Sequence, residues 1–221
     1  MARFGGIDQD AFSHISNLDY AQFDTTNTTP PTIEGRMAWN IDDGTMDLKL
    51  QNGVTLQIGQ ELNAKVANFT GSHIPEGAAV RVDGAQGQRL KVSLAAATDD
   101  LASATTLGVV THSGGIPHGS SGYVTILGLV HELDTSDFED GDVLYLSATP
   151  GVWSNVKPQA PTHLVQIGYV VNAAGGSAGS IYVHVQNGYE LDELHNVKIT
   201  SPQDGQVLKY QASTGLWINS F

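Results

Sequence analysis

The chain of 221 residues contains no cysteine, which excludes disulfides, thiolate metal sites and cysteine nucleophiles and leaves the redox compartment undetermined. Basic residues are scarce as well, since 10 Lys and Arg stand against 23 Asp and Glu, a formal net charge of −13. Such a chain lacks the basic footprint that phosphate contacts require, so we expect no nucleic-acid partner. Stability has to come from packing, to which association between copies could add.

Long hydrophobic stretches are also missing. The longest apolar run, Leu164 to Val171, contains Gln166 and is far too short to span a bilayer. The start, Met1 to Asp8, lacks the apolar stretch of a signal peptide. We therefore expect a protein that is made in the cytoplasm and does not insert into a membrane.

Helical periodicity is nearly absent, and the best candidates are short segments at Asp8 to Leu18 and Glu190 to Leu194. What the chain has instead is a succession of short β-branched runs, such as Tyr123 to Leu127 and Ile181 to Val185, separated by glycine-rich turns. Regularly spaced short strands of this kind are typical of a β-sandwich or β-barrel. The sequence predicts an all-β protein with one compact sandwich or barrel domain.

Composition divides the chain into four regions. Residues 1–34 show no sustained period and contain a polar segment that ends in two prolines, which predicts an extended N-terminal docking arm. In residues 35–61, apolar and polar residues alternate on either side of Asp43-Gly44 and Asn52-Gly53. This pattern predicts a pair of hairpins. We expect residues 62–188 to form the β domain and residues 189–221 to form a linker and a C-terminal hairpin. In the arm, the aromatic residues expected to dock are Phe4, Phe12, Tyr20 and Phe23.

One internal repeat stands out. Asp140 to Asn155, the first repeat, aligns without gaps on Asp204 to Asn219, the second repeat, and eight of the sixteen positions are identical. Each copy predicts a hairpin that an Asp-Gly pair opens and a tryptophan clamps across the strands. The clamp residues are Asp140, Gly141, Trp153, Asp204, Gly205 and Trp217. Because an isolated hairpin is marginal in water, the second repeat requires cover from the main domain or from neighbouring subunits.

Patterns that suggest chemistry have plainer explanations. Gly175 to Gly179 places Ser177 in a Gly-x-Ser-x-Gly pattern, but a strand follows where a nucleophile elbow needs a helix. The pairs His112 with His118 and His131 with Glu132 lack a recognised ligand spacing. The acidic stretch 134–142 lacks the alternating acids of a calcium loop. We expect no enzyme activity, no cofactor and no metal within one subunit, although one histidine from each of three subunits could form a site on a trimer axis.

Several sequence segments resemble segments of proteins from tailed-bacteriophage particles. Gly35 to Asn40 with Asp43 to Leu48 looks like the hairpin that opens many phage fibre proteins. The ending Ile199 to Asn219 is similar to a shaft or linker motif that recurs in such fibres. Between them, Ile74 to Val80 and Phe138 to Tyr145 resemble small β-barrel modules of capsid-decoration proteins.

The resemblance implies a homotrimer on the virion surface whose N-terminal arm docks to the major capsid protein or to tail or adaptor proteins. The expected function is that of a short fibre or a fibre base, on the head or the tail. Fibres that recognise a host usually continue well past the shaft motif, whereas this chain stops at Phe221, so we do not expect receptor binding by these residues.

Two alternatives remain open. A capsid decoration or cement protein would lie across capsomer junctions, and its hundreds of copies per particle would separate it from a fibre. A carbohydrate-binding receptor module would use exposed aromatic residues as sugar platforms, and the candidates are Trp39, Trp153 and Trp217.

Overall fold

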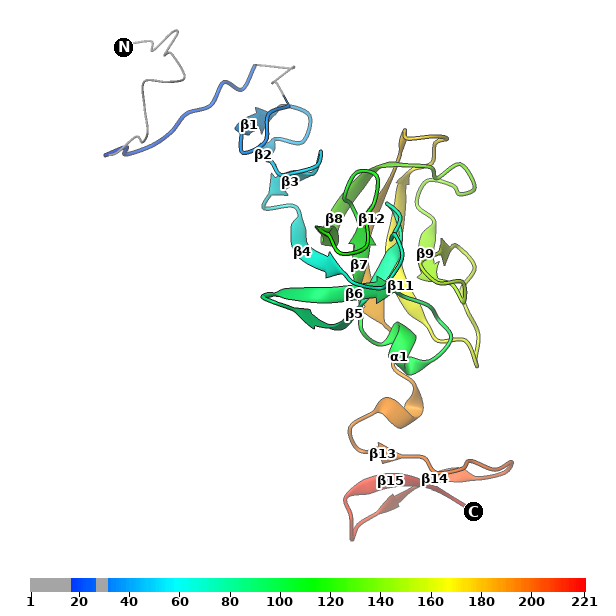
Figure 1. Cartoon of the computed structure of the whole chain (residues 1–221). Coiled ribbons are helices and arrows are strands. Elements are labelled where there is room, and N and C mark those ends of the chain that lie inside the picture. The colour runs from blue at the N-terminus through cyan, green and yellow to red at the C-terminus, as the bar shows by residue number, and fades with distance from the viewer. Residues whose placement is uncertain (1–16, 27–31) are drawn as a thin grey trace.

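The computed structural model describes residues 17–26 and 32–221, and it is almost entirely β (Figure 1). Strands hold 44% of the described residues and helices 4%, which confirms the all-β expectation. A small N-terminal sheet lies at one end, a barrel with an extended sheet lies in the middle, and a second small sheet lies at the other end (Figure 1). The expected helix at Asp8 to Leu18 falls almost wholly outside the described residues, as do Phe4 and Phe12 of the expected arm.

The N-terminal sheet is a three-stranded antiparallel meander. Its order is β1-β2-β3, and its strands are β1 (Met37–Asn40), β2 (Thr45–Lys49) and β3 (Thr55–Ile58). Asn52 and Gly53 both have positive φ, at 57° and 76°, as a tight turn between twisted strands requires. The strand registers confirm the two hairpins predicted here.

The central domain is built on nine strands in the order β10-β9-β11-β12-β8-β4-β6-β5-β7. Strand β7 also pairs with β8, so the strands β8, β4, β6, β5 and β7 close on themselves as a barrel, while β12, β11, β9 and β10 continue outward from β8. The bounds are β4 (Leu62–Asn68), β5 (Ala79–Gln86), β6 (Arg89–Leu94), β7 (Thr106–Val110), β8 (Ser121–Leu133), β9 (Val143–Leu146), β10 (Trp153–Ser154), β11 (Val165–Asn172) and β12 (Gly179–Asn187).

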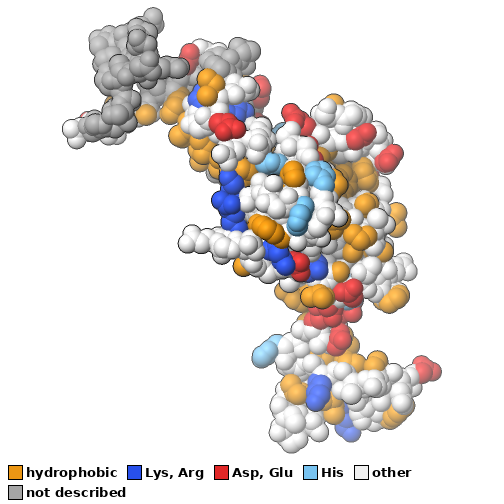
Figure 2. Space-filling view, viewed as in Figure 1, with side chains coloured by type: hydrophobic (Ala, Val, Ile, Leu, Met, Phe, Trp, Pro, Cys, Tyr) orange, Lys and Arg blue, Asp and Glu red, His pale blue; other side chains and the backbone are white. Residues whose placement is uncertain are grey.

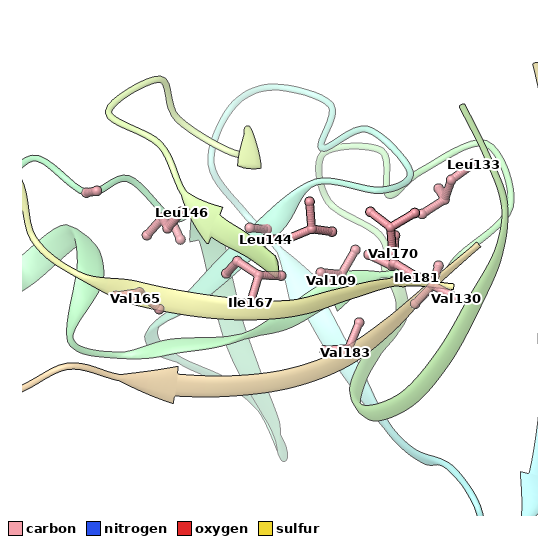
Figure 3. Packing of buried hydrophobic residues seen from close by; sticks show 13 residues of the cluster. Val109, Val130, Leu133, Leu144, Leu146, Val165, Ile167, Val170, Ile181 and Val183 are labelled. Carbon is pink, nitrogen blue, oxygen red and sulfur yellow. The ribbon is translucent and has the colours of Figure 1, made fainter. Parts of the chain in front are cut away.

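Two apolar clusters form the core of this domain. One fills the closed barrel and includes Val66, Val80 and Val124. The other gathers side chains from β7, β8, β9, β11 and β12 beneath the sheet extension (Figure 3). A short helix, α1 (Asp100–Ser103), follows β6, and its N-cap Asp99 accepts a hydrogen bond from the Ala102 backbone N–H at 3.0 Å. The sequence pattern did not predict this helix.

The C-terminal sheet has the order β13-β15-β14, with β13 (Val197–Lys198) parallel to β15 (Leu216–Ser220) and β14 (Val207–Gln211) antiparallel to it. A 3₁₀ turn, η1 (Leu191–Glu193), lies in the linker where a short helix was predicted. Both repeats form hairpins in the same register, because Trp153 pairs with Leu146 and Trp217 pairs with Tyr210, which are equivalent positions. The sequence of the repeat therefore determines which residues pair within each hairpin.

Candidate assembly surfaces

The N-terminal sheet has one apolar and one polar face. Side chains alternate between the faces of a strand, so the registers of β1, β2 and β3 align one set of apolar side chains. Hydrophobic side chains are visible on this part of the surface in Figure 2. The aligned set comprises Met37, Trp39, Met46, Leu48, Leu56 and Ile58.

The apolar face of this sheet is only partly covered. Met37 and Ile58 at its rim are 44% and 41% exposed, and Trp39, Met46, Leu48 and Leu56 are half-buried, whereas Gln57 on the polar face is 5% exposed. The polar face holds a hydrogen-bond network in which the Asn40 side-chain amide donates to Asp43 at 2.9 Å and to Asp47 at 3.3 Å. A soluble domain normally covers its apolar faces, so an apolar face that is left partly exposed marks a contact surface.

Glu61 joins the polar face to the central domain. Its carboxylate accepts hydrogen bonds from the backbone N–H of Gln57, at 3.0 Å, and of Leu129 in β8. Burial raises the pKa of Glu61, and the nearby carboxylates of Asp47 and Asp43 add to this effect. Together they bring the pKa to about 7. The junction thus holds a carboxyl group that ionises near neutral pH.

Lys65 makes a second connection between the two parts. Its ammonium donates to the Gln51 side chain at 2.7 Å and lies 5.3 Å from the centre of the Tyr123 ring. Tyr123 in turn stacks on the buried His112 ring at 6.3 Å. Desolvation of His112 and the charge of Lys65 both lower the pKa of this histidine, so the stack favours a neutral imidazole.

The two histidines that sequence reasoning paired make separate contacts. His112 stacks on Tyr123, whereas His118 accepts a hydrogen bond from the Gly71 backbone N–H at 3.0 Å and meets Phe69 edge-on. Across residues 17–26 and 32–221, no three His, Asp or Glu side chains are arranged to hold a metal ion.

Part of the expected docking arm lies beside the apolar face. Tyr20 and Phe23 line a hollow of about 490 Å³ together with Trp39 and Met46. Tyr20 is largely exposed. Aromatic side chains of the 17–26 segment therefore extend the apolar surface of the N-terminal sheet.

The first repeat is fastened into the central domain. The Trp153 indole N–H donates to the Gly77 carbonyl at 2.8 Å, and its ring lies 5.2 Å from the Phe138 ring. Asp140 accepts a hydrogen bond from the Ala173 backbone N–H at 2.7 Å, and the Gly141 N–H donates to the Val170 carbonyl at 2.9 Å. The clamp residues of this copy thus bind it to β11 and to the loop before β5.

A groove of about 470 Å³ opens beside Trp153. Phe138 and Trp153 contribute aromatic surface, and Glu76, Asp134 and Asp137 contribute carboxylates. Asp134 accepts hydrogen bonds from the Ser136 hydroxyl and backbone N–H, which hold the pKa of its carboxyl below the usual range. The acidic stretch therefore shapes a turn as well as the rim of the groove.

The second repeat carries its clamp on the surface. Tyr210 and Trp217 lie side by side, with ring centres 5.5 Å apart, and both are exposed. Gly205 has a φ of 81° and Gly141 a φ of 87°, so the Asp-Gly opening of the two hairpins uses the same left-handed backbone. Asp204 is exposed at the start of this hairpin.

His163 holds the linker against the central domain. Its Nδ1 lies 3.1 Å from an Asp100 carboxylate oxygen in α1 and 3.3 Å from a Glu190 carboxylate oxygen in the linker. Nearby, the Asn187 side-chain amide donates to the Ala104 carbonyl at 3.0 Å. The path to the C-terminal sheet is therefore anchored at α1, a contact that sequence spacing gave no signal for.

Ser177 lies in the exposed turn between β11 and β12. Strand β12 begins two residues later, so the strand-to-helix turn of a nucleophile elbow is not formed here.

No protein-family model matches the chain, and no curated protein matches its sequence. None of the helices in the described part of the chain has the length and hydrophobicity to cross a membrane.

Proposed function

We propose that this chain is a non-enzymatic structural protein of a tailed-phage virion, a short fibre or fibre base on the head or tail. The observation that carries the proposal is the N-terminal sheet, whose apolar face leaves Met37 exposed and Trp39 and Leu48 half-buried. On its other side, the Gln57 backbone N–H donates to Glu61. A second small sheet with exposed aromatic residues lies at the other end of the barrel (Figure 1). A domain with partly exposed apolar surface at both ends is suited to assembly.

The proposed partners follow from these surfaces. The chain forms a homotrimer, and the N-terminal arm attaches it to the major capsid protein or to a tail or adaptor protein. Tyr20 and Phe23, which lie next to Trp39 and Met46, support a docking role for the arm because they leave aromatic surface exposed. The net charge of −13 keeps separate copies apart in solution until the apolar surfaces meet.

Immunogold labelling of the phage particles whose genome encodes this chain tests the proposal. A fibre predicts a small number of labels, at the tail or at defined points on the head. Label spread in hundreds of copies over the shell would replace the fibre by the decoration protein. Particles that carry no label would overturn the structural function altogether.

One observation favours a second candidate, a carbohydrate-binding receptor module. The groove beside Trp153 combines aromatic surface with carboxylates, as sugar sites do. The indole N–H of Trp153 is, however, already bonded to the Gly77 carbonyl, which fixes the ring as part of the domain. A glycan array that gives binding lost in Phe138→Ala would favour this candidate over a purely structural role.

A further inference from the structure

The first repeat shows how the hairpin is covered when it has a partner. Its Leu144 and Leu146 point into the apolar core (Figure 3). Trp153 pairs with Leu146, which places it on the same face, and its ring packs against Phe138. The equivalent residues of the second repeat are Leu208, Tyr210 and Trp217. Leu146 is 1% exposed, whereas its counterpart Tyr210 is 53% exposed. The second repeat therefore presents, uncovered, the face that the first repeat buries.

The strand edge differs in the same way. In the first repeat, β9 lies between β10 and β11, and residues 143–145 pair with residues 166–169 of β11. In the second repeat, β14 pairs with β15 on one side, and no strand of the described residues pairs with its other side. An edge strand with open backbone donors and acceptors is ready to pair with another chain.

We propose that the open edge of β14, with the face formed by Leu208, Tyr210 and Trp217, is a docking surface for the C-terminal sheet of a second copy of this chain. The proposal rests on the assembly function proposed above and names its partner. Contact between copies covers the same positions that β11 and Phe138 help to cover in the first repeat. Apolar faces then meet apolar faces around a common axis.

Charge favours another copy as the occupant. Residues 195–221 contain Lys198 and Lys209 against Asp204, so this segment carries 2 − 1 = +1, whereas the preceding residues carry 8 − 22 = −14. Copies repel one another wherever their acidic surfaces approach. Within strands β14 and β15, no carboxylate or ammonium group shares the face of Leu208, Tyr210 and Trp217, so copies can meet over the aromatic pair without that repulsion. Linker carboxylates of Glu190 and Asp192 line a hollow together with Leu208.

The anchored linker keeps this surface away from its own central domain. His163 and Asn187 hold the start of the linker at α1, and the C-terminal sheet projects beyond that point (Figure 1). The exposed aromatic pair therefore faces solvent in the single chain. A neighbouring copy supplies the cover that the chain's own barrel does not.

Two adjacent residues of β14 give a matched test. Tyr210 and Gln211 point to opposite faces, so Tyr210→Asp puts a charge on the proposed surface and Gln211→Asp puts the same charge behind it. We expect light scattering to show at least a tenfold weaker association for Tyr210→Asp and unchanged association for Gln211→Asp. Amide hydrogen exchange of β14 and β15 checks that the C-terminal sheet remains folded in both variants. Equal behaviour of the two variants would overturn the proposal.

Cross-linking provides an independent readout, because the natural chain has no cysteine. Under mild oxidation we expect Leu208→Cys to give covalent dimers and Lys209→Cys, on the opposite face, to give none. Cross-linking of neither variant, or a parent protein that stays monomeric, would overturn the docking surface. Neither result touches the virion function, which the labelling of particles decides separately.

Discussion

Trp153 and Trp217 occupy equivalent positions in the two repeats, and their hairpins pair in the same register. Their surroundings differ completely, since Trp153 is half-buried and hydrogen-bonded to Gly77, whereas Trp217 lies exposed beside Tyr210. Turn residues and strand alternation are therefore enough to set the local pairing. Burial depends on a third element, which β11 provides for the first repeat and which we assign to another copy for the second.

The largest effect expected from this comparison is that of Trp153→Ala. Removing a large aromatic ring that packs on Phe138 and leaving the Gly77 carbonyl without its donor should cost about 3 kcal/mol in the free energy of unfolding. Urea unfolding of the central domain measures this cost. An unchanged midpoint would contradict the role of Trp153 as a clamp.

Glu61 predicts that the attachment of the N-terminal sheet weakens as pH rises. Its pKa is about 7 in the folded chain against 4.5 for an unperturbed Glu, so the folded state binds more protons between these pH values and stability falls as pH rises across that window. Discounted for solvent screening, the loss is about 1 to 2 kcal/mol. Urea unfolding at pH 5 and pH 8 should show it in the parent and lose it in Glu61→Gln. The same pH dependence in both proteins would show that Glu61 is not its source.

The variant His163→Ala tests whether His163 anchors the linker, and with it the second repeat, to the central domain. Asp100 and Glu190 are both exposed, so the lost contacts should cost at most about 1 kcal/mol. The expected result is faster amide hydrogen exchange at residues 187–193 with little change in the melting of the barrel. If exchange there stays as slow as in the parent, His163 does not hold the linker.

The smallest effect is expected for Trp217→Ala. Because Trp217 contacts Tyr210 outside the central domain, its loss should change the unfolding free energy of that domain by less than about 0.5 kcal/mol. The matched truncation of Trp153 serves as its control in the same urea titration. A cost similar to that of Trp153→Ala would show that the second repeat already packs on the barrel.

Local features of the fold could be predicted from the sequence. Asn52-Gly53 and the Asp-Gly pairs mark turns, and alternating residues mark the strands on either side. The closure of the barrel through β7 and β8 could not be predicted, because it joins segments whose pairing leaves no short-range pattern. The helix α1 was missed since four residues carry too little periodicity.

The candidate surfaces were predictable only in part. Alternation identifies the apolar set around Trp39 and Leu48, but it does not say which face of the sheet turns toward the rest of the chain. That orientation depends on Glu61 and its contacts with Gln57 and β8, which lie outside the alternating pattern. The anchoring of the linker by His163 likewise arises from three residues far apart in the sequence.

The solution mass of the full-length chain, measured by light scattering over a range of concentrations, tests the central claim that the uncovered apolar surfaces drive self-assembly. The account predicts a mass close to three times 23.4 kDa. A mass of 23.4 kDa at every concentration would contradict it, because a stable monomer would leave both terminal sheets without the partner on which the account depends.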